Sequence, residues 1–214
     1  YNQALSIFED LNDLANKSVT IYAISGILVD QGDLETAMKL YQQVLDVDEE
    51  LDNSHSKAAT LQAMANLYVL QGNFENAMQL YEQALDIFEK IGDPQNKSTT
   101  LVSIAHAYSI YDKSEDAMRL CEQAISISEN IPRCKSEALR ELASIVFARG
   151  ELDRAKNIYK ESLEIYRKLE DLEGVASTTL GIAKILIYED KLEDAINLSQ
   201  QSLQIFVNLD DAPG

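Results

Sequence analysis

The residues best suited to chemistry in this sequence are two histidines and two cysteines. His55 and His106 lie far apart, and neither has a partner at the spacing that brings metal ligands together. Cys121 and Cys134 form neither a disulfide framework nor a metal-binding cluster. We therefore expect no metal site, and two isolated cysteines are typical of a reducing, cytoplasmic setting.

Paired carboxylates are the other candidates for acid–base chemistry. Glu49-Glu50 and Glu170-Asp171 fall in predicted outward-facing helix ends or loops, where carboxylates are expected to be ordinary and solvent-exposed. The sequence has no glycine-rich phosphate loop, no histidine pair at helical spacing and no Ser–His arrangement. We therefore expect no enzymatic activity, no catalytic residue and no cofactor.

The charge balance narrows the classes of partner. The 214 residues carry 36 acidic and 18 basic side chains, for a net charge of −18, and 46% of the residues are hydrophobic. Nucleic acids and anionic membranes attract clustered Lys and Arg, so both are disfavoured as partners. No apolar run reaches the roughly 18 residues of a membrane span. The acidity suits a basic protein partner, or it serves solubility alone.

The elements that would position a site are organised as a repeat with a period close to 40 residues. The column that defines the repeat is Ala37, Ala77, Ala117, Ala155 and Ala195. Four residues after each alanine stand Tyr41, Tyr81, Cys121, Tyr159 and Ser199. Twelve residues before each alanine stand Ser25, Ala65, Ala105, Ala143 and Ala183. Five copies in register are far too many for chance.

Each copy contains two apolar stripes with helical spacing. In the second copy Gly72-Asn73 separates the two helices, and Gly92 to Pro94 closes the copy, because proline cannot continue a helix. The predicted first helices are Ser18–Val29, Ser56–Leu70, Ser98–Tyr111, Lys135–Ala148 and Val175–Tyr188. Each second helix is predicted to follow its first helix as an antiparallel partner.

The small and aromatic columns resemble the tetratricopeptide repeat family. The second copy shows the match in Ala65 and Tyr68 of its first helix and in Ala77, Tyr81 and Ala84 of its second. The sequence lacks tryptophan and the proline that the family places near the end of the second helix, and its period exceeds the usual 34 residues. The long unit is similar to those of kinesin light chain and of large bacterial regulators. The resemblance implies an all-α, right-handed superhelical solenoid of antiparallel helix pairs.

About five and a half repeats are expected to form a single solenoid over residues 1–214. Residues 1–14 correspond to the second helix of a truncated repeat. The complete repeats are expected at about 15–54, 55–94, 95–132, 133–172 and 173–214. Because the sequence begins inside a repeat, we expect it to be a fragment of a longer protein.

The resemblance also implies that the first helices line a concave groove. Of the 36 acidic residues, two fall in the predicted first helices, Glu137 and Glu141. The implied groove residues are Tyr22, Val29, Gln62, Asn66, Val69, Val102, His106, Ser109, Arg140, Ser144, Phe147, Leu180, Lys184, Ile187 and Tyr188. These side chains are either apolar or polar and uncharged, with Arg140 and Lys184 as the clear cations, and such a lining suits the burial of a partner.

Ordinary packing is the competing explanation for many of these side chains. Ile104 and Ala105 are expected to belong to the core, and His106 is expected to be a polar groove or packing residue. Cys121 stands in a packing column, so it is expected to be a small core hydrophobe. Cys134, which follows a proline in a predicted loop, is expected to be more exposed.

Three hypotheses about function follow. The first is a protein-interaction scaffold that binds a peptide or a helix of a partner protein in the groove. The second is a sensor or regulatory arm of a larger multi-domain signalling enzyme whose catalytic domain lies outside this fragment. The third is end-to-end self-association through apolar surface at the ends of the array.

Overall fold

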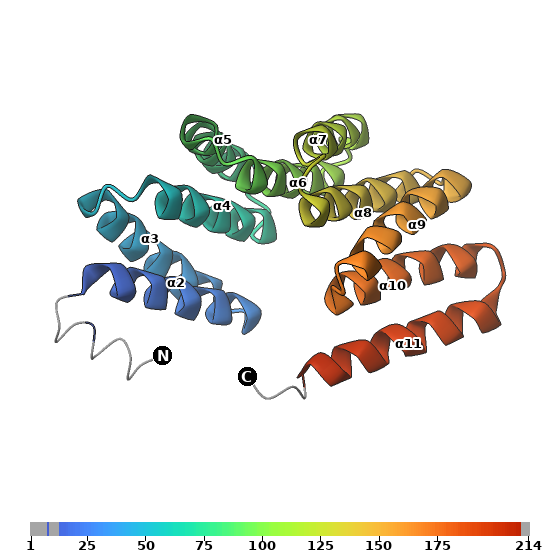
Figure 1. The fold of residues 1–214 in the computed structure, drawn as a ribbon. Coiled ribbons are helices and arrows are strands. Elements are labelled where there is room, and N and C mark those ends of the chain that lie inside the picture. Colours follow the sequence, from blue (N-terminus) through green and yellow to red (C-terminus); the bar gives the residue numbers. More distant parts are fainter. Residues whose placement is uncertain (1–7, 9–12, 211–214) are drawn as a thin grey trace. The chain divides into compact units, whose positions relative to one another are not determined.

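The computed structural model describes residue 8 and residues 13–210 (Figure 1). Over these residues it contains ten α-helices. They are α2 (Leu14–Asp30), α3 (Leu34–Glu50), α4 (Ser54–Leu70), α5 (Phe74–Ile91), α6 (Pro94–Ile110), α7 (Ser114–Ile127), α8 (Pro132–Ala148), α9 (Leu152–Lys168), α10 (Leu172–Tyr188) and α11 (Leu192–Asp210). The helix predicted over residues 1–14 lies almost entirely outside the described part. Among the described helices, none is long and apolar enough to cross a bilayer.

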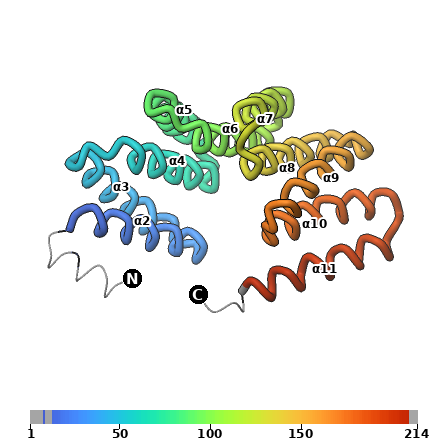
Figure 2. The backbone as a smooth tube through the Cα atoms, viewed as in Figure 1, coloured from blue at the N-terminus to red at the C-terminus, as the bar shows by residue number. Residues whose placement is uncertain are grey.

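The helices pack as antiparallel pairs in a repeat array, so the predicted all-α fold class is confirmed (Figures 1 and 2). The chain divides into two compact units, residues 1–100 and 101–214, with the boundary inside α6. In unit 1, α3 packs against both α2 and α4, and α5 pairs with α4. In unit 2, α8 packs against α7 and α9, and α10 packs against α9 and α11.

The first helix of each pair begins two to four residues earlier than predicted. Asn53, for example, is the N-cap of α4, and its side chain accepts a hydrogen bond from the Ser56 backbone N–H at 3.2 Å. Pro94 is the first residue of α6 rather than the end of a repeat. Proline is tolerated at the first helical position, where its missing N–H would have no partner within the helix.

The expectation for Cys134 is wrong for the same reason. Pro132 opens α8, so Cys134 lies in the first turn of a helix and not in a loop. Its residue exposure is 4%. Counting from the shared alanines, Cys134 takes the register that Gly174 takes in α10, and Gly174 lies against the Tyr166 ring of α9. This register faces the preceding second helix, which buries Cys134.

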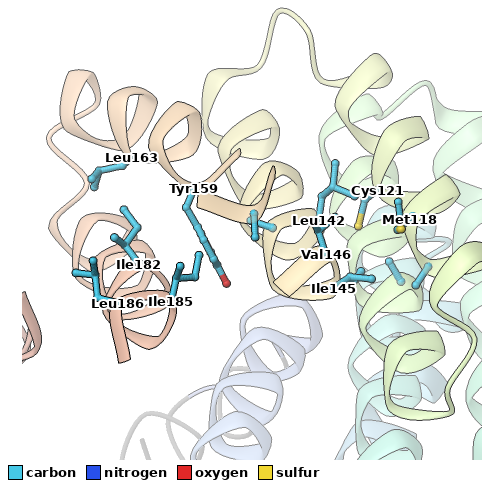
Figure 3. Close-up of a cluster of buried hydrophobic side chains, with 14 of the residues drawn as sticks. Met118, Cys121, Leu142, Ile145, Val146, Tyr159, Leu163, Ile182, Ile185 and Leu186 are labelled. Atoms are coloured by element: carbon cyan, nitrogen blue, oxygen red, sulfur yellow. The ribbon is translucent and has the colours of Figure 1, made fainter. Parts of the chain in front are cut away.

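Close fit between one pair and the next forms the core of unit 2. Figure 3 shows the Tyr159 ring of α9 between Ile185 of α10 and the Leu142–Val146 side of α8. Gly181 makes the approach of α10 possible, since a Cβ built there would lie 2.5 Å from Tyr159 Cζ. A tyrosine on one helix is thus matched by the absence of a side chain on the next.

At the preceding interface, between α7 and α8, the small and the large side chains are exchanged. Cys121 of α7 replaces the tyrosine of its column, and Glu141 of α8 replaces the glycine in the register of Gly181. Glu141 is only 8% exposed, close enough to act electrostatically on the Cys121 thiol, and its Oε1 lies 3.1 Å from Nδ1 of His106. Cys121 is fully buried, as predicted. A small residue on the second helix is therefore matched by a long one on the covering helix.

Substitution of Gly181 tests the fit against Tyr159. Gly181→Ala should lower the free energy of unfolding by about 1 kcal/mol, because an overpacking cost of about 1–3 kcal/mol exceeds the helix-propensity gain of about 1 kcal/mol. Gly26 is the matched control, since a Cβ built there meets no heavy atom of the described residues within 4 Å. Gly26→Ala should raise the free energy by about 0.5–1 kcal/mol. Urea unfolding followed by circular dichroism measures both changes, and equal effects would contradict the proposed fit.

The His106–Glu141 contact predicts a pH dependence. Hydrogen bonding to Glu141 raises the pKa of His106, while desolvation and Arg140 oppose the rise. NMR titration should therefore show a pKa above the ordinary value of about 6.5. In Glu141→Gln the pKa should fall to that value or below.

The sign of the linked stability follows from the raised pKa. The folded protein holds the His106 proton more tightly than the unfolded chain does. The His106–Glu141 contact therefore adds its full contribution to the free energy of unfolding below about pH 6.5, and this contribution is lost as the pH rises through the folded-state pKa. The His106 side chain is 60% exposed, so solvent screening limits the effect to below about 1 kcal/mol. Urea unfolding across pH 5–9, with His106→Gln as the reference, measures it.

Candidate functional site

Five of the predicted groove residues lie in unit 1: Tyr22, Val29, Gln62, Asn66 and Val69. The Tyr22 and Tyr41 rings pack edge to face, with centroids 5.3 Å apart. The Tyr81 hydroxyl donates a hydrogen bond to Oδ1 of Asn66. Burial raises the pKa of Tyr41 to about 12, so its hydroxyl stays neutral at physiological pH. Tyr22 and Asn66 therefore support the second-helix tyrosines, whatever else they bind.

Three predicted residues lie on α6 within unit 2. His106 is engaged with Glu141, and the Ser109 hydroxyl donates to the His106 carbonyl oxygen at 2.8 Å. Val102 is half-buried. Within the described residues, no group of three or more histidine, cysteine or carboxylate side chains could hold a metal ion.

The structure brings five predicted residues together in one cleft, which we call the basic cleft. Arg140 and Ser144 of α8 face Leu180, Lys184 and Ile187 of α10 across a volume of about 400 Å³. Its other lining residues are Tyr159, Ser177, Gly181, Ala183 and Ser199. Two of these ten residues are cations and none is a carboxylate, although the chain has twice as many acids as bases.

The cleft is held open by the same packing that forms the core. Gly181 and Tyr159 set the spacing of α9 and α10, and Ser144 hydrogen-bonds with the Tyr159 side chain. Burial raises the pKa of Tyr159, so its hydroxyl remains a neutral hydrogen-bonding group. Arg140 and Lys184 project from rigid helices, so the positive charge is in place before any ligand arrives.

A separate polar pocket that carries carboxylates adjoins one end of the basic cleft. This pocket of about 90 Å³ shares Arg140 and Ser177 with the cleft. It is also lined by Arg133, Glu137, Tyr166, Asp171, Glu173 and Gly174. Arg133 Nε lies 3.5 Å from a carboxylate oxygen of Glu137 and 3.5 Å from one of Asp171. Because α10 begins at Leu172, Glu173 belongs to a first helix that the sequence predicted to be free of acids.

The other end is apolar. A second pocket of about 390 Å³, which we call the apolar pocket, shares Ile187 and Ser199 with the basic cleft. Its remaining lining residues are Leu192, Ala195, Ile196, Gln200 and Leu203. The predicted residues Phe147 of α8 and Tyr188 of α10 pack edge to face, with ring centroids 5.2 Å apart.

Sequence reasoning did not identify Ser199 as a site residue. The sequence did contain a sign of it, because the repeat column of Ser199 has tyrosine in three of the five copies. A serine there leaves the volume of a phenol ring unfilled beside Lys184 and Ile187, and it lines both cavities. Gly181 was missed because a glycine inside a helix usually signals weak helix formation rather than close approach.

Comparisons with solved structures identify the same architecture. BtubC (BKLC) from P. vanneervenii superimposes with a TM-score of 0.73 at 16% identity, covering 100% of this chain and 91% of that one. A kinesin light chain-like array of nearly identical repeats from Podosopora anserina gives 0.62 at 19% identity, covering 90% and 96%. A Rap protein complexed with Competence and Sporulation Factor gives 0.80 at 16% identity.

The match to that Rap protein covers 97% of this chain but 59% of the Rap chain. These identities show a shared fold. No curated protein matches the sequence significantly. The tetratricopeptide repeat family matches residues 17–90, 56–130 and 135–206, which together span most of the sequence. The chain therefore belongs to the tetratricopeptide repeat family.

Proposed function

We propose that this chain is a protein-interaction module that holds an acidic segment of a partner protein in the basic cleft of unit 2. Proteins with these repeats generally mediate protein–protein interactions. The observation that carries the finer proposal is a carboxylate-free cleft of about 400 Å³ with Arg140 and Lys184 in a chain of net charge −18. Two cations and no carboxylate among ten lining residues give this cleft a charge opposite to that of the chain as a whole.

The geometry favours a peptide or a helix over a small metabolite. The cleft is bordered by a polar pocket at one end and by an apolar pocket at the other, so it continues along the helices. A segment with one or two carboxylates and a bulky apolar residue would match the lining. Because the helices are already ordered, little conformational entropy is lost by the protein on binding.

A second candidate is a regulatory arm that senses a peptide for a larger protein. The Rap structure that contains Competence and Sporulation Factor supports it, because the match covers only part of that longer chain. In this role the same cleft would bind the signal, and the output would arise elsewhere in the parent protein. A peptide-dependent change in the activity of an adjoining domain would favour this candidate over a passive scaffold.

Reversing the charge of the cleft tests the proposal. A random twelve-residue peptide library displayed on phage is selected on the wild-type chain, and enriched peptides are expected to contain Asp or Glu. For a synthesised binder, Arg140→Glu/Lys184→Glu should raise Kd at least about 100-fold, because attraction becomes repulsion. Isothermal titration calorimetry measures Kd, and circular dichroism should show unchanged helicity.

Charge reversal at exposed positions of the same unit that do not line the cleft is the matched control. Lys160→Glu/Arg167→Glu changes the net charge equally at exposed positions of α9. Screening at physiological salt, with a Debye length of about 8 Å, should keep its effect within about threefold. Equal losses in the two variants, or enrichment of peptides without acids, would contradict the assignment of the cleft.

A further inference from the structure

We propose that unit 1 contains a binding site for an arginine side chain, and that its occupant is a basic segment of a partner protein. The site, which we call the acidic pocket, has a volume of about 320 Å³ and lies where α3 ends and α4 begins. Its lining includes the carboxylates Asp48, Glu49 and Asp52, the cation Lys57, and Ile87 of α5. None of these residues lines the basic cleft, so this proposal can fail independently of the proposed function.

Asp48 is the residue that points to a ligand. It is 1% exposed, and the Ser18 hydroxyl of α2 donates a hydrogen bond to its Oδ1 at 3.1 Å. Its Oδ2 is buried and has no hydrogen-bond partner, and among the described residues no other carboxylate has such an atom. Because α2 contributes no residue to the acidic pocket, Oδ2 is the oxygen left on the pocket side. A buried polar atom without a partner destabilises the fold, and a donor that enters the pocket would offset this cost.

The repeat explains why there is space beside Asp48. Eleven residues after the shared alanines, the column reads Asp48, Phe88, Ser128, Tyr166 and Phe206. Phe88 is fully buried and Tyr166 is 2% exposed, so rings fill this position in their own copies. A carboxylate occupies less volume than a ring, and it brings a polar atom to a position that is otherwise suited to apolar packing. The carboxylate therefore lowers stability where a ring would raise it, as functional residues commonly do.

The rim of the acidic pocket adds negative charge to that of Asp48. Glu49 and Asp52 are exposed, and the Lys57 Nζ lies 2.6 Å from Oε1 of Glu49. An equivalent bridge, between Lys97 and Glu89, occurs in the same register one repeat later, so the bridge is a feature of the repeat. One lysine thus balances one of three lining carboxylates, which leaves a net negative charge for a cationic ligand.

The dispersion of the carboxylates favours a guanidinium over a compact cation. Within the described residues, no group of three or more histidine, cysteine or carboxylate side chains could hold a metal ion. A guanidinium presents five N–H donors in one plane, so it can reach acceptors at separate points. It is also more weakly hydrated than an ammonium, which makes it the cation better suited to burial. Ile87 provides an apolar surface for the aliphatic part of the arginine side chain.

Charge identifies the occupant as part of a basic protein segment. The net charge of −18 attracts basic segments at long range. The exposed carboxylates of Glu49 and Asp52 would meet further basic residues beside the arginine, whereas they would repel the α-carboxylate of free arginine. A peptide bond replaces that α-carboxylate when the arginine belongs to a protein.

Titration with small arginine derivatives at constant ionic strength tests the acidic pocket. N-acetylarginine methylamide mimics an arginine within a peptide, and it should shift the NMR signals of the Ile87 methyl group and of the amides of residues 48–57 in a saturable way. The citrulline derivative has the same shape without the charge and should bind at least about tenfold more weakly. Acetyl-Gly-Lys-Arg-Lys-Gly-amide should bind more tightly than the single capped arginine, and free arginine should not.

Substitutions separate binding in the pocket from general attraction to an acidic chain. Asp48→Asn removes the buried charge and should raise the Kd of the capped arginine at least about tenfold. Asp46→Asn is the matched control, because it makes the same change at an exposed position of α3 that does not line the pocket, and Kd should stay within about twofold. Lys57→Met removes a competing cation and should lower Kd about threefold.

Filling the pocket gives a readout that a folding defect cannot imitate. Asp48→Phe places at this position the ring that Phe88 provides one repeat later. The variant should lose measurable binding of the capped arginine and should also unfold at a higher urea concentration than the wild-type chain. Because it lacks the acidic pocket, peptide selection on this variant reports on the basic cleft without a contribution from unit 1.

Several outcomes would overturn the proposal. They are equal shifts with the citrulline derivative, an unchanged Kd in Asp48→Asn, and a lower urea midpoint for Asp48→Phe, which would show that Asp48 serves packing. Shifts that spread over exposed carboxylates and persist in Asp48→Asn would identify unspecific attraction to the acidic chain. Tighter binding of free arginine than of the basic peptide would identify a small metabolite, and not a protein segment, as the occupant.

Discussion

The steric fit between the second helix of one pair and the first helix of the next governs this structure. Where α9 carries Tyr159, α10 carries Gly181, and where α7 carries Cys121, α8 carries Glu141. Tyr159, Cys121 and Glu141 are all buried, although the side chains that fill the two interfaces differ. The near-constant period of the alanine column keeps these positions opposite one another. Side-chain volume at two registers therefore decides how closely neighbouring pairs approach.

The same constraint explains where space for a ligand arises. Ser199 is a small residue in the column of Tyr159, and within the described chain no long side chain compensates for it. The unfilled volume lies beside Lys184 and Ile187, so a departure from the packing rule becomes a cavity with a cation at its border. At Cys121 the equivalent space is filled by Glu141, which supplies both the volume and the charge.

The charges around the basic cleft decide which ligands it favours. The net charge of −18 disfavours acidic segments as ligands of the chain in general, whereas the residues that line the basic cleft include Arg140 and Lys184 and no carboxylate. Lys156 of α9 provides a contrast, because both carboxylate oxygens of Glu189 lie 2.8 Å from its Nζ and neutralise it. Whether a lysine pairs with a carboxylate, as Lys156 does, or lines a cleft, as Lys184 does, therefore depends on the neighbouring residues. The family's common role in protein interactions agrees with this arrangement.

The sequence by itself determined the helices, their pairing and the family, because apolar periodicity and small-residue columns are local and repeat five times. It placed the starts of the first helices too late and expected Cys134 to be exposed. For α6 and α8 the reason is that Pro94 and Pro132 can either end one helix or begin the next. It also proposed fifteen groove residues, of which the tertiary structure gathered five in one cleft. Only the folded chain could show this, because a cavity depends on the volumes of side chains about 20 to 60 residues apart, and a single column does not reveal what stands opposite it.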